Sequence, residues 1–354
     1  MKIFSFIILV LCMNSISYAN DWKAVNQAIV EQHIQPRYKI LSAQIAALNE
    51  KTQSFCQKPN PKNLNTLKNT FNEAMDSWVA VQHLRHGPIE LFERYHRIQF
   101  WPDKHGVSQR QINTFLAKKD SEILKLENFQ NSSVAIQGLS TFEYLLYPKN
   151  AKDVISSQYR CQMMQAIAQN IHQISNEVTE EWQDEKKQFK FFFDANAKNF
   201  GLTDGKVDYA NQIETATVFY LEMHTQIQSI IDQKILDPLG ENNKPKMKKS
   251  ESWRSDRSLQ NIETSLKALE DLYTVGFAQK TDSKLNAEIL ASFQNVYKSL
   301  QPLKPSFNDA VTNPKERQDF DNLISSLRDL QRLVFSPLSQ ALEIPIGFNS
   351  LDGD

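Results

Sequence analysis

Apolar residues recur at intervals of three and four along most of this chain, and this pattern constrains its fold most. The longest run extends from about Ser156 to Asp194 and places an apolar stripe on one face of a helix. Shorter runs with the same spacing cover 22–52, 64–85, 133–147, 209–235, 258–274, 282–300 and 314–342. No series of segments alternates between apolar and polar residues as strands do. The sequence therefore predicts an all-α protein.

Glycine is scarce, with 9 residues in 354, against a usual share of about 7%. Glycine destabilises helix interiors, whereas β-proteins and nucleotide-binding α/β folds need it in their turns, so its scarcity also favours helices. The best candidate for a domain boundary is the segment GLTDG, from Gly201 to Gly205. We expect two helical bundles, formed by residues 20–200 and 201–354.

The first 19 residues have the features of a cleavable signal peptide. A lysine precedes an apolar run from Ile3 to Met13, and a Ser-Tyr-Ala sequence that a signal peptidase would recognise ends at Ala19. The run is shorter than the roughly 20 apolar residues that span a bilayer, and no later stretch is apolar enough to do so. We expect a periplasmic protein with no stable membrane insertion after cleavage. A lipoprotein attached through Cys12 is the alternative, which the large Leu11 before it disfavours.

Charge and cysteine content narrow the choice of partners. The net charge is −1, or about −2 without the signal peptide, which argues against nucleic acid or an anionic membrane surface as the main partner. The mature chain keeps Cys56 and Cys161, and such a pair in an oxidising compartment predicts a disulfide. The bridge would close a loop of about 105 residues. Two thiols alone would fall short of the four ligands of a structural zinc site.

The richest cluster of possible metal ligands is HLRHGPIELFERYH, residues 83–96. On an unbroken helix His83, His86 and Glu90 would share a face, because their spacings are three and four residues. Gly87-Pro88 interrupts that helix, so the shared face depends on how the chain continues. An ordinary charged helix surface is the alternative interpretation.

Three further segments carry candidate site residues. The loop FWPDKHG (100–106) contains Trp101 and Asp103, although its aromatic residues could equally anchor the loop in the core. The segment AIQGLSTFEYLLYP (135–148) holds a glycine, a serine and a glutamate that could face one cavity, or simply pack within it. The segment ESWRSDRS (251–258) offers Trp253 and Arg254 just before a helix.

Several enzyme classes lack their motifs here. The sequence has no phosphate-binding glycine loop, no Gly-x-Ser-x-Gly, no His-Glu-x-x-His and no Cys-x-x-Cys-His. A cysteine nucleophile is also disfavoured if both mature cysteines form a disulfide.

Five segments, in order along the chain, together resemble the imelysin-like family of periplasmic proteins once classed as M75 peptidases. They are WVAVQHLRHGPIE (78–90), FWPD (100–103), QGLSTFEYLLYP (137–148), the tryptophan segment 251–258 and the closing GFNSLDGD. The resemblance implies two helical bundles with a groove between them. It also implies kinship with iron-regulated envelope proteins and with the iron-binding component of some ferrous uptake systems.

The resemblance also identifies candidate residues for the groove. The family signature is Gly-x-His-x-x-Glu, which reads Gly138-Leu-Ser140-Thr-Phe-Glu143 here, so serine stands in the place of histidine. A serine hydroxyl is a poor ligand for iron or zinc, which disfavours a metallopeptidase. The residues that could replace the missing ligand are His86 and Glu90, provided that they face Glu143. The other groove candidates are Arg85, Trp101, Asp103, Trp253 and Arg254.

Three functions follow as hypotheses. The first is a non-catalytic periplasmic protein that binds iron, another divalent metal or a metal complex for acquisition, through His86, Glu90 and Glu143. The second is an interaction module whose groove binds a periplasmic peptide or protein. The third, which Ser140 disfavours, is a metal-dependent peptidase.

Overall fold

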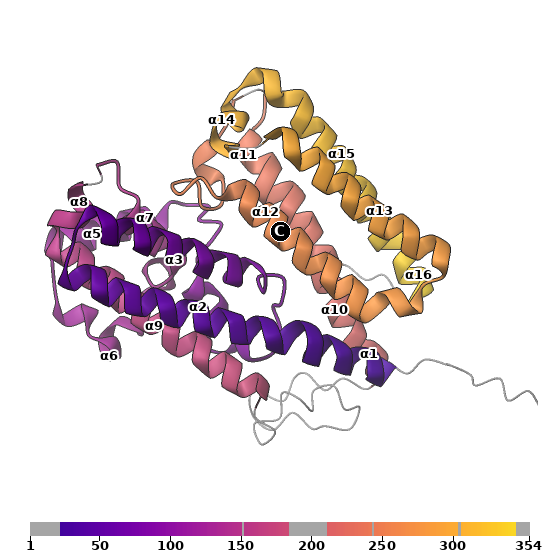
Figure 1. The fold of residues 1–354 in the computed structure, drawn as a ribbon, viewed down its shortest axis with the longest axis horizontal. Coiled ribbons are helices and arrows are strands. Elements are labelled where there is room, and N and C mark those ends of the chain that lie inside the picture. The colour runs from indigo at the N-terminus through magenta and orange to yellow at the C-terminus, as the bar shows by residue number, and fades with distance from the viewer. Residues whose placement is uncertain (1–21, 151, 184–210, 243, 304–305, 345–354) are drawn as a thin grey trace, which may run out of the picture.

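The computed structural model describes residues 22–150, 152–183, 211–242, 244–303 and 306–344. All regular structure in these ranges is helical, which confirms the all-α prediction (Figure 1). None of the described helices is both long and apolar enough to cross a membrane. The signal-peptide segment 1–19, the boundary segment 201–205 and the closing GFNSLDGD lie outside the described residues.

Three long helices form the core of the first bundle. Helix α2 (Gln35–Gln57) packs along both α3 (Pro61–Val79) and α9 (Gln158–Gln183). Asn60 starts α3 as its N-cap, because its side chain accepts a hydrogen bond from the backbone N–H of Asn63 at 2.9 Å. Five short helices complete this part of the chain: α4 (Arg94–Ile98), α5 (Val107–Lys118), α6 (Leu126–Phe129), α7 (Leu139–Leu146) and α8 (Lys152–Ser156).

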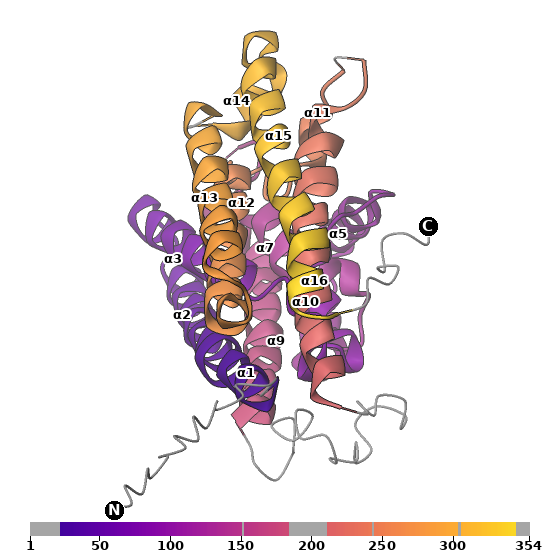
Figure 2. The ribbon, with the colours of Figure 1, turned by 90° about the vertical axis from the view of Figure 1, so that its right-hand side faces the viewer.

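The second bundle is built on four helices that lie side by side in Figure 2. They are α10 (Gln212–Ser229), α12 (Ser258–Leu272), α13 (Ser283–Leu300) and α15 (Arg317–Leu333). Asn211 and Asp282 cap α10 and α13 through hydrogen bonds from backbone N–H groups to their side chains. The short helices here are α11 (Asp237–Leu239), α14 (Phe307–Thr312) and α16 (Ser339–Ala341).

Shorter helical segments join these elements. Four wide π-type turns continue the long helices: η1 (Ile29–Ile34), η7 (Ile230–Leu236), η9 (Tyr273–Phe277) and η13 (Val334–Leu338). The described 3-10 turns are η2 (Gly87–Ile89), η3 (Leu91–Glu93), η4 (Glu122–Leu124), η5 (Val134–Ile136), η8 (Met247–Lys249), η10 (Ala278–Lys280), η11 (Gln301–Leu303) and η12 (Pro314–Glu316).

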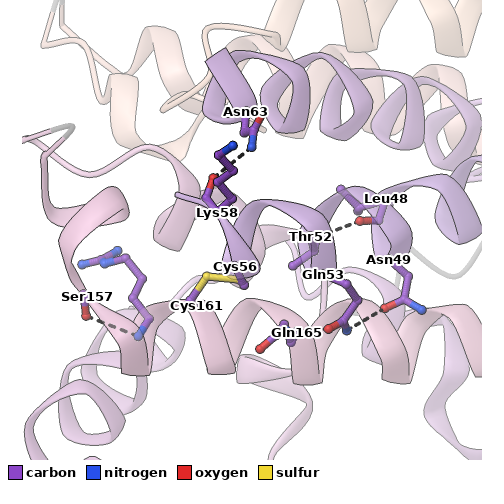
Figure 3. Close-up of a disulfide and its surroundings, with 11 residues drawn as sticks. Leu48, Asn49, Thr52, Gln53, Cys56, Lys58, Asn63, Ser157, Cys161 and Gln165 are labelled. Atoms are coloured by element: carbon purple, nitrogen blue, oxygen red, sulfur yellow. Dashed lines mark hydrogen bonds between the residues drawn. A yellow bond between two sulfur atoms is a disulfide. The ribbon is translucent and has the colours of Figure 1, made fainter. Parts of the chain in front are cut away.

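The disulfide that the sequence predicts is present between Cys56 and Cys161 (Figure 3). Their Cα atoms are 5.7 Å apart, and the bridge joins the last turn of α2 to the first turn of α9. Beside it, the Gln165 side chain donates a hydrogen bond to Gln53 at 2.5 Å. The cross-link therefore fixes one end of the longest helix pair in the first bundle.

The two bundles lie side by side (Figure 1), and helices of one pack on helices of the other. Helix α12 packs on α3, and α1 (Trp22–Ala28) packs against α10. The buried Asn26 side chain of α1 donates to the backbone oxygen of Gln212 at 2.8 Å. The first described helix thus belongs to the interface between the bundles.

The expected helix over 64–85 is shorter in the structure. Helix α3 ends at Val79, and residues 80–83 form a turn, so His83 and His86 leave the helix that carries Leu64. Gly87 adopts a φ of 76°, which a residue with a side chain rarely adopts, and starts a 3-10 turn there. The unbroken helix face that would unite His83, His86 and Glu90 is therefore not formed.

Candidate functional site

A pocket of about 280 Å³ opens between the two bundles. Residues from the segments 100–112 and 140–144 line it from the first bundle, and Asp237 and residues from the segment 248–254 line it from the second. His105 and Glu251 are not among the lining residues. We call it the inter-bundle pocket. Of the predicted groove residues, Trp101, Asp103, Ser140, Trp253 and Arg254 line this pocket.

Two predicted groove residues have other positions. Gly138 precedes α7, and a Cβ atom there would lie 2.4 Å from the backbone oxygen of Ile98, so glycine permits this close approach of two backbones. Arg85 lies over the ring of Tyr95, with its guanidinium carbon 4.8 Å from the ring centroid. Neither residue lines the inter-bundle pocket.

Glu143 reaches the pocket from α7 and is held by the second bundle. Its Oε1 accepts hydrogen bonds from the backbone N–H of Ser255 at 2.8 Å and from the Ser255 hydroxyl at 2.6 Å. Burial raises the pKa of the Glu143 carboxyl, and these hydrogen bonds together with the Arg254 charge oppose the rise. The carboxyl therefore links the two bundles at the base of the pocket.

Arg254 forms one wall of the pocket together with two aromatic rings. Its guanidinium carbon lies 4.3 Å from the ring centroid of Trp253 and 4.6 Å from that of Tyr144. Stacking on aromatic faces fixes a guanidinium while leaving its N–H edges available for hydrogen bonds. The side chain amide of Asn308 donates to the Trp253 backbone oxygen at 2.7 Å, which holds the loop that carries this wall.

Asp103 has a structural role at the pocket margin. Its Oδ1 and Oδ2 accept hydrogen bonds from the backbone N–H groups of Val107 and Ser108, both at 2.9 Å. These are the exposed donors of the first turn of α5, so Asp103 stabilises the start of that helix.

A buried ion pair, which the sequence did not predict, lies behind the pocket. The Lys234 ammonium donates to Glu251 at 2.7 Å and to Gln82 of the first bundle at 2.7 Å. Burial raises the pKa of Glu251, but the Lys234 charge and the hydrogen bonds outweigh it, so the pKa lies below its usual value. Lys234 also lies 5.8 Å from the ring centroid of Trp101. The one sequence feature that could have indicated this ion pair is a lysine within the apolar run IIDQKIL.

The predicted ligands His86 and Glu90 lie away from this pocket. His86 Nδ1 lies 2.7 Å from Glu222 Oε1, and the same oxygen accepts from the Arg85 backbone N–H. Burial lowers the pKa of His86, but the Glu222 charge and hydrogen bond outweigh burial and raise it overall. Glu90 is exposed. Within the described ranges, no group of three or more His, Cys, Asp or Glu side chains is arranged to hold a metal ion.

A sequence model of the imelysin family, Peptidase_M75, matches residues 34–334 of the chain. The chain belongs to the imelysin family.

Two solved structures share its fold. An imelysin-like protein from Psychrobacter arcticum has a TM-score of 0.75 and 17% identity, covering 92% of this chain and 97% of that one. A Parabacteroides distasonis protein, whose proposed identity is an iron-regulated protein A precursor, has a TM-score of 0.70 and 13% identity, covering 91% and 94%. No curated protein matched the sequence.

In this imelysin, the tract that resembles the family signature forms the start of α7. Ser140 and Glu143 are three residues apart on that helix, and both line the inter-bundle pocket. The predicted replacement ligands, His86 and Glu90, do not line it. The structure thus brings Glu143 together with the groove residues rather than with His86.

A buried contact between two histidines was also not predicted from the sequence. His33 Nε2 lies 2.9 Å from His83 Nε2, and His33 Nδ1 lies 2.7 Å from Asp271 of α12. Burial is the main cause that lowers the pKa of His83 well below its usual value, and the neighbouring His33 lowers it further. This pair joins the first bundle to the second at a point outside the pocket lining.

Proposed function

We propose that this imelysin-family chain is a non-catalytic periplasmic protein that binds an iron compound in the inter-bundle pocket for acquisition by the cell. The observation that carries the proposal is the joint lining of one pocket by Glu143, Arg254 and the aromatic rings of Trp101 and Trp253. Pockets at the boundary between two structural units, with aromatic walls and a few fixed polar groups, are typical ligand sites. The iron-regulated description of one structural relative supports iron as the cargo.

The hydrogen bonding of the pocket supports binding rather than catalysis. Of the described residues that line it, none is histidine, so Ser140 has no adjacent imidazole to remove its proton. Asp103 accepts two backbone hydrogen bonds, and Glu143 accepts two from Ser255. Both oxygens of Asp103 and one oxygen of Glu143 therefore hold backbone and loop in place, which disfavours these carboxylates as general bases.

Retention of iron by the purified protein tests this proposal. The mature chain, residues 20–354, is incubated with ferrous iron and with soluble ferric complexes, desalted, and analysed for bound metal by mass spectrometry. We expect iron to remain bound in at least one form, and Glu143→Gln to reduce the amount retained. Glu288→Gln is the matched control, because Glu288 lies on α13 and its only described ion pair is with Lys284 at 3.9 Å. Absence of retained iron in every form would refute the proposal.

A peptide or protein partner is the second candidate function. The aromatic rings of Trp101, Tyr144 and Trp253 all line the pocket and remain partly exposed, which is common where side chains of a partner dock. Failure of iron retention, together with capture of a defined periplasmic peptide that Trp253→Ala abolishes, would favour this function over the first.

A further inference from the structure

Some charged side chains of the inter-bundle pocket have ion-pair or hydrogen-bond partners within the protein, and others have none described. Four cationic residues line it, Lys104, Lys248, Lys249 and Arg254. Three carboxylates line it as well, Asp103, Glu143 and Asp237. The formal charges nearly balance, so the sign of the field in the pocket depends on which of these groups already have partners.

The carboxylates all have partners within the protein. Both oxygens of Asp103 accept backbone hydrogen bonds, and Glu143 accepts two hydrogen bonds from Ser255 through one oxygen. Asp237 pairs with Lys249 at 3.0 Å, so its charge is balanced by that lysine. The hydrogen bonds of Asp103 and Glu143 leave these two carboxylates with fewer free lone pairs to coordinate a cation.

Three of the cations have no ion pair among the described residues. Lys104 and Lys248 are exposed, and Arg254 stacks on aromatic rings. The Glu143 carboxyl lies close enough to Arg254 for their charges to interact, but the two side chains form no described salt bridge. Lys104 belongs to the first bundle and Lys248 to the second, so positive charge faces the pocket opening from both sides. The pocket therefore carries local positive charge although the whole chain has a net charge of −1.

Arg254 adds geometry to this charge. Its guanidinium is held against Trp253 and Tyr144 at 4.3 and 4.6 Å, which keeps its plane fixed. A fixed guanidinium is suited to paired hydrogen bonds with carboxylate oxygens. The two rings also offer flat apolar surface to the carbon skeleton of a ligand.

We propose that the cargo enters the inter-bundle pocket as an anionic complex, with the iron already enclosed by carboxylate-bearing ligands, and not as the bare ion. This inference rests on the proposed function. A hydrated iron cation meets three unpaired positive charges and no described group of three donors that could coordinate it. A small anionic complex meets Arg254 as a hydrogen-bonding partner and the two lysines as counter-charges. The volume of about 280 Å³ limits the complex to a small one, since drug-sized ligands occupy clefts of roughly 300 to 1,000 Å³.

Binding titrations with defined iron species test the inference. The mature chain is titrated with ferric citrate, with iron-free citrate and, without oxygen, with ferrous chloride, and binding is followed by calorimetry and tryptophan fluorescence. We expect ferric citrate to bind more tightly than either of the other probes. Its affinity should fall as sodium chloride rises from about 50 to about 500 mM, because salt screens exposed charges.

Substitutions at the unpaired cations give the decisive comparison. Arg254→Gln removes the charge while keeping a polar side chain, and we expect ferric citrate to bind about tenfold more weakly, a change of about 1.4 kcal/mol. Lys248→Gln should weaken binding several-fold, and it cannot disturb the core because Lys248 is exposed. Arg328→Gln is the matched control, since Arg328 lies on α15 and pairs with Asp232 outside the pocket lining. Circular dichroism verifies that each variant is folded.

The outcomes separate this inference from the proposed function. Tighter binding of ferrous chloride than of ferric citrate, or unchanged ferric citrate affinity in both Arg254→Gln and Lys248→Gln, would overturn the anionic complex but leave iron as the cargo. Equal binding of citrate with and without iron would support an anionic ligand and refute iron. A loss of ferric citrate binding in the two pocket variants, but not in Arg328→Gln, would support both.

Discussion

The buried pair of Lys234 and Glu251 offers the sharpest test of how the two bundles hold the pocket together. Both side chains are almost inaccessible, with exposed fractions of 2% and 1%. Lys234→Met keeps the length of the side chain but removes the ammonium. Glu251 then remains as a buried carboxylate without its cation, and the side chain oxygen of Gln82 loses its donor.

The expected loss of stability is large. Removing one partner of a buried ion pair costs about 3–5 kcal/mol, because the remaining charge stays in a poorly polarisable interior. Adding Glu251→Gln to Lys234→Met removes that charge while keeping a group that can bond Gln82 and Asn261. We therefore expect the double variant to regain about 1–3 kcal/mol relative to Lys234→Met alone.

Acidity provides an independent check on the same reasoning. Without the ammonium, burial raises the pKa of Glu251 above its usual value, so lowering the pH protonates the carboxyl in the folded state. Protonation removes the buried charge, and the stability gap between Lys234→Met and the unsubstituted chain should narrow from about pH 7 to about pH 5. A Lys298→Met variant is the control, because Lys298 is exposed on the outer helix α13 and has no described ion pair.

Urea unfolding followed by circular dichroism at both pH values measures these differences, with the disulfide intact. Fluorescence unfolding curves must coincide with the dichroism curves before a single free energy is assigned. A loss below about 1 kcal/mol for Lys234→Met, or a double variant less stable than the single one, would refute the argument that the pair is held as charged partners.

Three further predictions concern the rest of the chain. Replacing Cys56 and Cys161 by serine should lower the free energy of unfolding by about 4–5 kcal/mol in the loop-entropy model, since the bridge spans 105 residues; urea unfolding measures this, and a change under about 1 kcal/mol would contradict it. The pKa of His86 lies above its usual value, so its contribution to stability is complete below about pH 6.5 and is lost as the pH rises through the folded pKa. An NMR titration should show that the pKa of His86 falls in Glu222→Gln. An unchanged pKa would contradict this prediction. Gly138→Ala places a Cβ atom 2.4 Å from a backbone oxygen and should lower the thermal midpoint by several degrees. An unchanged thermal midpoint would show that the backbone moves to accommodate the Cβ atom at little cost in free energy.

The fold could be predicted from the sequence because its causes are local. Three- and four-residue spacing of apolar side chains determines a helix within a few turns, and the long helices α3, α9, α10, α12, α13 and α15 lie within the expected runs or close to their ends. The cysteine pair could also be predicted, since only two cysteines follow the predicted signal peptide. The end of α3 could not, because residues 80–83 turn away where Gln82 and His83 meet partners from η1, η7 and the 250–257 loop.

The site was only partly predictable, for a related reason. Motifs identified Trp101, Ser140, Trp253 and Arg254, which line one pocket. The partners that give these residues their properties come from distant positions: Glu143 meets Ser255 across 112 residues, and Gln82 meets Lys234 across 152. Such pairs carry no spacing signal, so the sequence named Glu143 as a metal ligand without the hydrogen bonds that already occupy one of its oxygens.

These distant partners also explain why the pocket is prepared for a charged ligand before one arrives. Each pocket carboxylate is oriented by a backbone N–H, a hydroxyl or a lysine, whereas Arg254 is oriented by rings that neutralise none of its charge. Orientation and charge are therefore supplied by different groups. A site fixed in this way need not reorganise when an anion binds. A flexible arginine would lose conformational entropy on binding, and this cost would reduce the binding free energy, whereas a fixed arginine avoids it. It follows that Trp253→Ala should weaken an anionic ligand even though the removed ring carries no charge.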